Sequence, residues 1–219
     1  MSPDNETQNQ TEPPKGVVHR LSLYLRELRK LAADSKVRIS STRLGELLDL
    51  NPAQVRKDLS YLGQIGLPGV GYRCVDLIER IQQTLGTHRT WPVALFGCGK
   101  IGQALLSYGG FDSQGFHIVA AFDADFEVIG TVHGGIRVES ISDAAASIER
   151  LGIRLAIIAV PAEQAQATAD QLVTAGIQGI LNFAPVVLVL PKSVSVVAVD
   201  LAIGLEQLAF GVVRQLEND

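Results

Sequence analysis

Cysteine is nearly absent from this sequence, and so are long apolar runs. The chain of 219 residues has two cysteines, Cys74 and Cys98, without metal-ligand spacing. They fall in segments that we assign to different domains, so neither a disulfide nor a zinc site is expected. No run of about 18 apolar residues occurs, and the N-terminus is polar instead of resembling a signal peptide. We therefore expect a cytoplasmic protein with no membrane association.

A large net charge is also lacking, but the charges that are present are unevenly distributed. The whole chain carries −4, whereas residues 16–80 hold eleven Lys and Arg against seven Asp and Glu. Residues 81–219 hold seven against thirteen. Because affinity for phosphate depends on the local field, this asymmetry indicates nucleic-acid binding by the N-terminal third.

The chain is organised around an apolar run, residues 93–96, that is followed by glycines spaced G-x-G-x-x-G. The pattern predicts a buried strand, a phosphate-binding turn and the start of a helix. Gly97 permits the turn, Gly99 lets backbone N–H groups approach a pyrophosphate, and Gly102 lets helix and strand pack closely. The helix N-terminus adds N–H donors and partial positive charge. The cofactor-binding candidates in this turn are Gly97, Cys98, Gly99, Lys100, Ile101 and Gly102.

A second apolar run, residues 115–122, ends on Asp123, about 20 residues past the last glycine. A dinucleotide-binding fold places there the carboxylate that holds a ribose diol. It would repel a 2′-phosphate, and no arginine directly follows it, so NAD and NADH are favoured over their phosphorylated forms. Asp125 is a second candidate, for which a solvated turn residue is the preferred interpretation. The alternative to nucleotide binding is a glycine-rich packing turn followed by a loop aspartate. For Cys98, a redox-reactive thiol is considered as a separate role.

The N-terminal part has the pattern of a helix-turn-helix. Apolar residues at helical spacing predict a first helix from Val17 to about Asp34, a short helix after Ser40, and a third helix that Asn51 and Pro52 begin. Val55, Leu59 and Leu62 form the inward stripe of the third helix. The opposite arc suits DNA bases or phosphates, and its members are Ala53, Arg56, Lys57 and Ser60.

The segment that follows, residues 63–72, is too rich in glycine for a helix and predicts a hairpin that would form a wing beside the recognition helix. Another amphipathic helix is expected from Val75 to Leu85. The alternative for this whole region is a three-helix module that binds another protein.

Beyond Asp123, strand and helix patterns alternate. Short strands are expected near 136–138, 155–160, 179–181 and 194–199, with helices over 144–151 and 162–175. Continuous apolar strands separated by helices indicate a doubly wound parallel sheet, with the ligand beyond the carboxyl ends of the strands. Apolar residues at those ends would disfavour the positively charged nicotinamide ring of NAD+ and so select NADH. They are Val160, Pro161, Phe183, Ala184 and Pro185.

The last segment, residues 201–216, is apolar almost all round. Such a helix cannot stay exposed on a soluble monomer, so we expect it to pack against another subunit of a homodimer, as a palindromic DNA site requires. A core helix of the same chain is the alternative.

Together these features resemble the Rex family of redox-sensing transcriptional repressors. The resemblance runs from about residue 16 to the end. The matching motifs, in chain order, are Arg38–Ser41, Gln54–Tyr61, Gly69–Tyr72, Gly97–Gly102 with Ala104–Tyr108, Ala120–Asp123, Val160–Ala162, Gly179–Pro185 and Val199–Ala202.

The resemblance implies an α/β fold with an N-terminal winged helix-turn-helix domain (16–86), a C-terminal Rossmann-like domain (87–200) and a terminal helix (201–219) swapped between subunits, after a disordered tail (1–15). It implies a homodimeric repressor that binds AT-rich inverted repeats of double-stranded operator DNA and is released by NADH. By the same resemblance, Tyr108 and Asp200 of the partner subunit form a pair whose hydrogen bonding differs between ligand states. Asn182 joins the cofactor site, and Ser41, Tyr61 and Gly71 join the DNA-binding set.

The sequence departs from the family pattern at two places, and two other functions are considered as alternatives. Leu67-Pro68 stand where family wings usually carry basic residues, and Lys100 stands where many members have a neutral residue. An NAD-dependent dehydrogenase would need a proton donor near the nicotinamide, and none of the four histidines lies at the carboxyl end of a predicted strand. A CoA-binding domain would predict no ribose carboxylate at Asp123.

Overall fold

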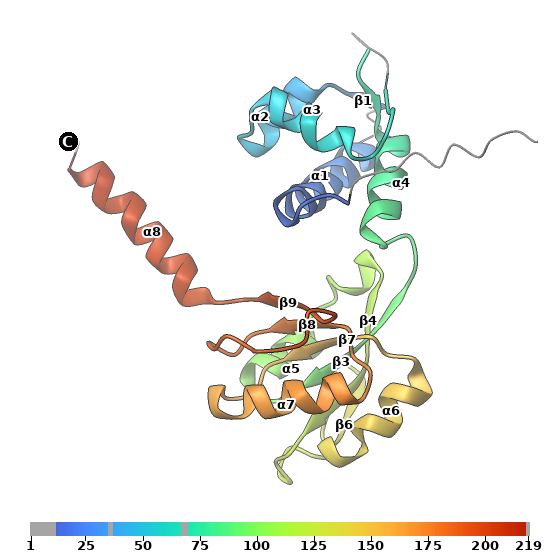
Figure 1. Ribbon diagram of the computed structural model, residues 1–219, viewed down its shortest axis with the longest axis vertical. Helices are drawn as coiled ribbons and strands as arrows, with labels where there is room; N and C mark the ends of the chain where they lie inside the picture. The colour runs from blue at the N-terminus through green and yellow to red at the C-terminus, as the bar shows by residue number, and fades with distance from the viewer. Residues whose placement is uncertain (1–11, 35–36, 67–69, 218–219) are drawn as a thin grey trace, which may run out of the picture. The chain divides into compact units, whose positions relative to one another are not determined.

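The computed structural model describes residues 12–34, 37–66 and 70–217 and divides into two compact units, one ending at Arg89 and the other beginning at Thr90 (Figure 1). Most of the expected tail, residues 1–11, lies outside the described residues. Its last residue, Lys15, is helical, which corrects the predicted boundary. The helix begins there because the carbonyl of Pro14, which has extended backbone, accepts hydrogen bonds from the N–H groups of Val17 and Val18.

The described residues of the first unit form four helices and a two-stranded sheet (Figure 1). Its core is formed by one apolar stripe from each helix, and these stripes include Leu28, Leu44, Val55 and Leu77. The elements, in chain order, are α1 (Lys15–Ala33), β1 (Arg38–Ile39), α2 (Ser41–Leu48), α3 (Pro52–Ser60), β2 (Tyr72–Arg73) and α4 (Cys74–Leu85).

The turn between α2 and α3 has the tight geometry that a helix-turn-helix requires. Asp49 takes the left-handed conformation (φ 53°), and the N–H of Leu50 donates to the carbonyl of Gly45 over 2.9 Å. A Cβ at Gly45 would lie 2.5 Å from the carbonyl oxygen of Leu50, so glycine is needed here. The side chain of Asn51 then caps α3 by accepting from the N–H of Ala53 over 2.8 Å. The predicted turn and cap are confirmed.

The predicted hairpin within residues 63–72 is wrong in its pairing. Tyr72 and Arg73 pair antiparallel with Ile39 and Arg38, which belong to the segment before α2. The close approach depends on Gly71 (φ 77°), where a Cβ would lie 2.6 Å from the carbonyl oxygen of Ile39. The wing residues Leu67-Pro68 lie outside the described residues.

The second unit contains a seven-stranded sheet in the order β5-β6-β4-β3-β7-β8-β9. Six strands are parallel, and the order grows outward from β3 in both directions, which places the switch point beside the glycine turn. The parallel strands are β3 (Trp91–Phe96), β4 (Phe116–Asp123), β6 (Ile136–Ser140), β7 (Leu155–Ile158), β8 (Gly179–Asn182) and β9 (Ser195–Ala198).

The edge strand β5 (Val132–His133) was not predicted and pairs antiparallel with β6. Gly134 and Gly135 connect the two strands, both with positive φ (57° and 82°), as two-residue hairpin turns require. This Gly-Gly pair is the feature of the sequence from which the hairpin of β5 and β6 could have been predicted.

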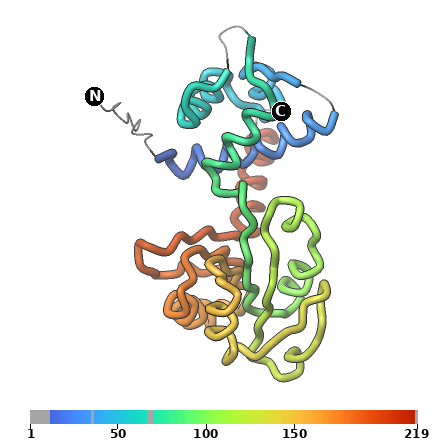
Figure 2. Tube along the Cα trace, turned by 90° about the vertical axis from the view of Figure 1, so that its right-hand side faces the viewer, coloured from blue at the N-terminus to red at the C-terminus, as the bar shows by residue number. Residues whose placement is uncertain are grey.

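Helices cover both faces of the sheet. α6 (Ala144–Leu151) and α7 (Ala162–Thr174) pack on one face, over alternate residues of the strands such as Phe96, Phe122 and Ile158. α5 (Lys100–Leu106) packs on the other, over Leu95 and Ile157. Figure 2 shows α6 and α7, in gold and orange, to the left of the strands and α5, in green, to the right. Two short 3-10 helices are η1 (Asp112–Gln114) and η2 (Ile141–Asp143).

The C-terminal helix α8 (Leu201–Leu216) buries none of its residues against its own chain. Leu205 and Leu208, for example, are each 67% exposed. The alternative of a core helix within one chain is therefore not supported. No helix in the described part of the chain combines the length and apolar character needed to cross a membrane.

Candidate functional site

The glycine turn after β3 has a separate steric reason for each glycine. Gly97 has φ 89°, and a Cβ there would lie 2.6 Å from the carbonyl oxygen of Ala159. A Cβ at Gly102 would clash with the carbonyl oxygen of Gly97, so the first turn of α5 can pack only without one. A Cβ at Gly99 would meet nothing within 4 Å. Gly99 thus faces open space, where a ligand could approach the backbone.

Asp123, the last residue of β4, is tied to this turn. Its Oδ2 accepts a hydrogen bond of 2.6 Å from the backbone N–H of Cys98, and its Oδ1 accepts one of 2.9 Å from the N–H of Asp125. Both bonds use backbone donors, which leaves further lone pairs on each carboxylate oxygen. The carboxylate is therefore fixed in place and still able to accept from a diol.

Cys98 is not suited to the reactive role considered above. The thiol is fully buried, and burial together with the charge of Asp123 raises its pKa to about 12. The thiolate, which is the reactive form, is therefore scarce at neutral pH. Its backbone N–H is also committed to Asp123.

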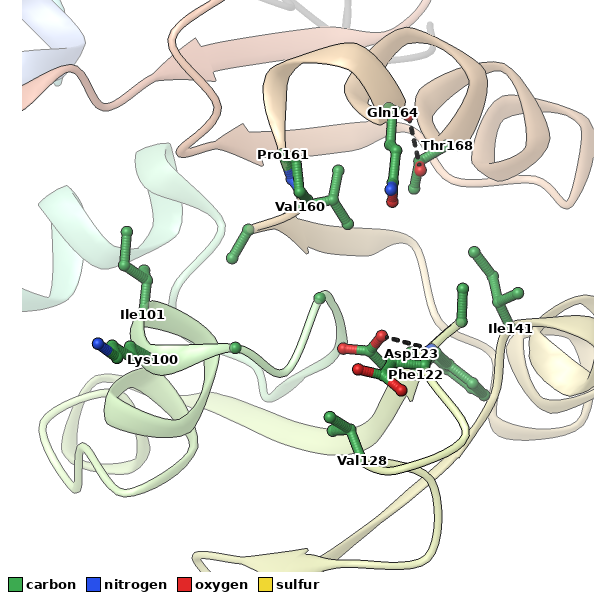
Figure 3. A pocket seen from close by; sticks show the side chains of 15 residues that line it. Lys100, Ile101, Phe122, Asp123, Val128, Ile141, Val160, Pro161, Gln164 and Thr168 are labelled. Atoms are coloured by element: carbon green, nitrogen blue, oxygen red, sulfur yellow. Dashed lines mark hydrogen bonds between the residues drawn. The ribbon is translucent and has the colours of Figure 1, made fainter.

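A cavity of about 870 Å³ lies where the glycine turn, the end of β4 and the end of β7 meet (Figure 3). Seven predicted cofactor residues line it: Gly97, Gly99, Lys100, Ile101, Asp123, Val160 and Pro161. In Figure 3 the carboxylate of Asp123 lies on one side of the cavity and the β7–α7 connection with Val160 and Pro161 on the other. The cavity thus lies beyond the carboxyl ends of the strands, as predicted.

Three predicted residues at the end of β8 do not line this cavity. Asn182 is buried, and its side chain donates to the carbonyls of Ala184 and Val186 and accepts from the N–H of Ala184. It therefore shapes the turn after β8. Phe183 packs against the core on the α5 face, and Ala184 is buried on the opposite face. Cys98 and Gly102 also lie outside the cavity lining.

Tyr108 and Asp200 lie away from this cavity. Tyr108 is 56% exposed, meets Phe111 edge-to-face with ring centroids 5.0 Å apart, and lines a separate, mainly apolar cavity of about 520 Å³. Asp200 caps α8, with Oδ1 accepting from the N–H groups of Ala202 and Ile203. The predicted contact between these two residues joins two subunits and stays a prediction.

Sequence reasoning missed several residues that line the nucleotide-sized cavity. Val128 and Ile141 contribute apolar walls, and Gln164 and Thr168 contribute polar groups one helical turn apart on α7. The polar pair could have been predicted, because α7 follows directly after the predicted strand end Val160-Pro161. Its first turns therefore lie beside the expected ligand site. Val128 lies in a turn and Ile141 begins the short helix η2, and neither segment carries a comparable signal in the sequence.

A second candidate site lies on α3 of the first unit, which the sequence analysis predicts to be the recognition helix. Its predicted outward residues Ala53, Arg56, Lys57 and Ser60 are all exposed. Arg56 Nη1 donates to the hydroxyl of Ser41, at the start of α2, over 3.3 Å, so two predicted DNA-binding residues lie together. Tyr61 is partly buried against the core, and Gly71 lies beside β1.

The inward side of α3 carries a residue that the sequence analysis did not single out. Asp58 has no exposed surface, and its carboxylate accepts bonds from Arg20 (2.6 and 2.8 Å), Tyr24 (2.7 Å) and Gln54 (2.7 Å). Burial works to raise the pKa of Asp58, but the three donors and the positive charge outweigh it, so this pKa is lowered. Burial and the bond to Asp58 raise the pKa of Tyr24.

Comparison with known proteins matches both halves of the chain. A family model described as "CoA binding domain" covers residues 88–186, and one described as "Putative DNA-binding protein N-terminus" covers residues 14–60. A redox-sensing transcriptional repressor Rex from Roseiflexus sp. (strain RS-1) is 44% identical over 207 residues, which is 94% of each chain. This chain belongs to the Rex family. A Rex protein from Chloroflexus aurantiacus (strain ATCC 29366 / DSM 635 / J-10-fl) is 43% identical and covers 94% of this chain and 97% of its own length.

Solved Rex structures match most of this chain. The Rex-family repressor RSP matches with a TM-score of 0.85 at 31% identity, over 92% of this chain and 94% of RSP. RSP has also been solved with β-NAD+ and operator DNA (TM-score 0.85) and with β-NADH (TM-score 0.84), again at 31% identity. The predicted α/β fold class, a Rossmann-like sheet joined to an N-terminal DNA-binding domain, is confirmed.

Proposed function

We propose that this chain is a homodimeric repressor that binds double-stranded operator DNA through α3 and is released when NADH occupies the cavity beside Asp123. The observation that carries the proposal is that a carboxylate fixed to a glycine turn lines a cavity of about 870 Å³ in the same chain as a helix-turn-helix. Its Rex relatives, which are named repressors, support the same conclusion.

The coenzyme is NADH or NAD+ rather than a phosphorylated form or CoA. Asp123 accepts from a ribose diol and repels a 2′-phosphate. Backbone N–H groups at Gly99 and the start of α5 face the pyrophosphate, with Lys100 on the same side of the cavity. Apolar residues at the ends of β7 and β8 disfavour the cationic ring of NAD+, which makes NADH the preferred state.

The DNA partner is an AT-rich inverted repeat. Arg56 and Lys57 face bases or phosphates from α3, with Ala53 and Ser60 on the same arc. α8, exposed along its whole length, pairs two copies by exchange between subunits, and a two-fold dimer matches a palindromic site. In that dimer Tyr108 faces Asp200 of the partner subunit. We place the protein in the cytoplasm, where DNA and coenzyme are both present.

The switch requires that NADH prefer the dimer whose recognition helices no longer match successive major grooves. A difference of about 10⁴-fold in affinity between the two arrangements would make the switch nearly complete. The test is an operator-binding curve at fixed total coenzyme and varied NADH/NAD+ ratio. We expect the bound fraction to fall as the ratio rises, and a flat curve would overturn the proposal.

The rival function is an NAD-dependent dehydrogenase, and we propose that the chain is not an enzyme. None of its four histidines is among the residues that line the described cavity. The check is to mix the protein with NADH and a range of small carbonyl compounds. Consumption of NADH at enzyme-like rates would establish the dehydrogenase instead.

A further inference from the structure

The cavity beside Asp123 corresponds to one half of the dinucleotide. In this fold the carboxylate at the end of the second strand holds the ribose whose 2′-position distinguishes the coenzymes, which is the adenosine ribose. The cavity continues from Asp123 past Val128 and Ile141 to α7, whereas Phe183 and Ala184, expected beside the nicotinamide, lie outside it. The described cavity therefore fits the adenosine half.

The walls beyond Asp123 suit a purine ring. Val128 and Ile141 offer apolar surface to the faces of a flat ring. Edge atoms of the ring then need hydrogen-bonding partners, because the site removes them from water.

Gln164 and Thr168 are the side chains on α7 that could supply those partners. The hydroxyl of Thr168 donates to the backbone carbonyl of Gln164 over 2.9 Å, and Thr168 is only 6% exposed. The hydroxyl of Thr168 therefore has no second hydrogen to donate to a ligand. The side-chain amide of Gln164 projects from α7 into the cavity (Figure 3). This side-chain group makes no hydrogen bond within the described part of the chain.

We propose that Gln164 recognises the adenine ring of the coenzyme through the edge that carries N6 and N7. The side-chain Oε1 accepts from the exocyclic amine, and Nε2 donates to N7, which is the pairing that a glutamine amide makes with adenine. This inference rests on the proposed binding of NAD(H). It adds a specificity-determining residue that acts on the base and not on the redox state.

Hypoxanthine provides a direct test of this pairing. It differs from adenine by an oxygen in place of the exocyclic amine, so two acceptors, O6 and N7, face the amide. Whichever way the amide turns, one of the two bonds is lost. Reduced nicotinamide hypoxanthine dinucleotide keeps the pyrophosphate, both riboses and the dihydronicotinamide, so any difference from NADH reports on the base.

The experiment titrates the full chain with each dinucleotide and follows dihydronicotinamide fluorescence. The wild type should bind NADH about tenfold more tightly, which is near the lower end of what such an amide–base pair supplies. Gln164→Ala should bind both dinucleotides alike, with the affinity that the wild type shows for the hypoxanthine form. Equal affinities in the wild type, or a preference that survives Gln164→Ala, would overturn the inference.

Two further variants separate this inference from the proposed function. Gln171→Ala, two turns further along α7 and outside the cavity lining, should keep the tenfold preference. Asp123→Ala should weaken the binding of both dinucleotides by the same factor and should therefore keep the preference for NADH. If the wild type binds neither dinucleotide, the proposed function itself fails, and this inference fails with it.

Discussion

Arg20 on α1 and Asp58 on α3 form a two-point ion pair, with Nε 2.6 Å from Oδ2 and Nη2 2.8 Å from Oδ1. Asp58 is buried and directly follows Lys57, which is exposed. The pair therefore fixes how α3 is rotated about its own axis, and with it the direction in which the basic residues point. The hydroxyl of Tyr24 adds a third bond to the same carboxylate.

Asp58→Asn should destabilise the first unit by about 3 kcal/mol at neutral pH, because it leaves buried donors without their charged acceptor. The wild-type pKa of Asp58 is lowered by folding, so its stabilisation is present above the unfolded value, about 4. It is lost as the pH falls through the folded pKa. Hydrogen exchange of the amides in α1 and α3, measured between pH 3 and 7, should show a steep acid dependence in the wild type and a shallower one in the variant.

The control for this experiment is Glu46→Gln. Glu46 pairs with Arg43 over 3.0 Å, but both side chains are 56% exposed, so this surface pair contributes little. We expect a change within about 0.5 kcal/mol. An equal loss in the two variants would mean that the buried network around Asp58 has no special role.

Two alanine substitutions in the glycine turn should have opposite consequences. Gly99→Ala adds a methyl group to open space, so the melting temperature should stay near that of the wild type while NADH affinity falls, because the pyrophosphate must approach this backbone. Gly102→Ala places its methyl group against the carbonyl of Gly97 and should lower the melting temperature itself. Differential scanning fluorimetry with and without NADH distinguishes the two. A wild-type NADH affinity in Gly99→Ala would show that the ligand lies elsewhere.

A feature could be predicted from the sequence when it depends on residues that are close together in the chain. The glycine turn and the cap at Asn51 depend on neighbouring residues, and both are found as expected. The pairing of Arg20 with Asp58 joins residues 38 apart and carries no local signal. Asn182 shows a related difficulty, since a residue at a strand end can face the ligand or the turn, and its three bonds hold it to the turn.

The double variant Arg56→Ala with Lys57→Ala should weaken operator binding severely and leave NADH affinity unchanged. Each side chain is exposed on α3, and loss of two phosphate or base contacts should also reduce the salt dependence of the remaining binding by about two units of slope. Fluorescence anisotropy with labelled operator at several salt concentrations measures both. Arg80→Ala, an exposed arginine on α4, serves as the control and should bind as the wild type does. Unchanged operator binding in the double variant would refute α3 as the recognition helix.

The exposed apolar surface of α8 makes a prediction about assembly. Leu205→Glu with Leu208→Glu places two charges on a helix that we expect to be buried by a second copy, where unpaired charge is costly. The variant should sediment as a monomer in analytical ultracentrifugation, while the wild type sediments as a dimer. Val187→Glu, the same kind of change at a residue 92% exposed outside α8, should leave the dimer intact. Because a monomer can engage only one half of an inverted repeat, operator affinity should fall together with the dimer. A dimeric double variant that still binds the operator would place the subunit contact elsewhere and leave the exposed leucines of α8 without this explanation.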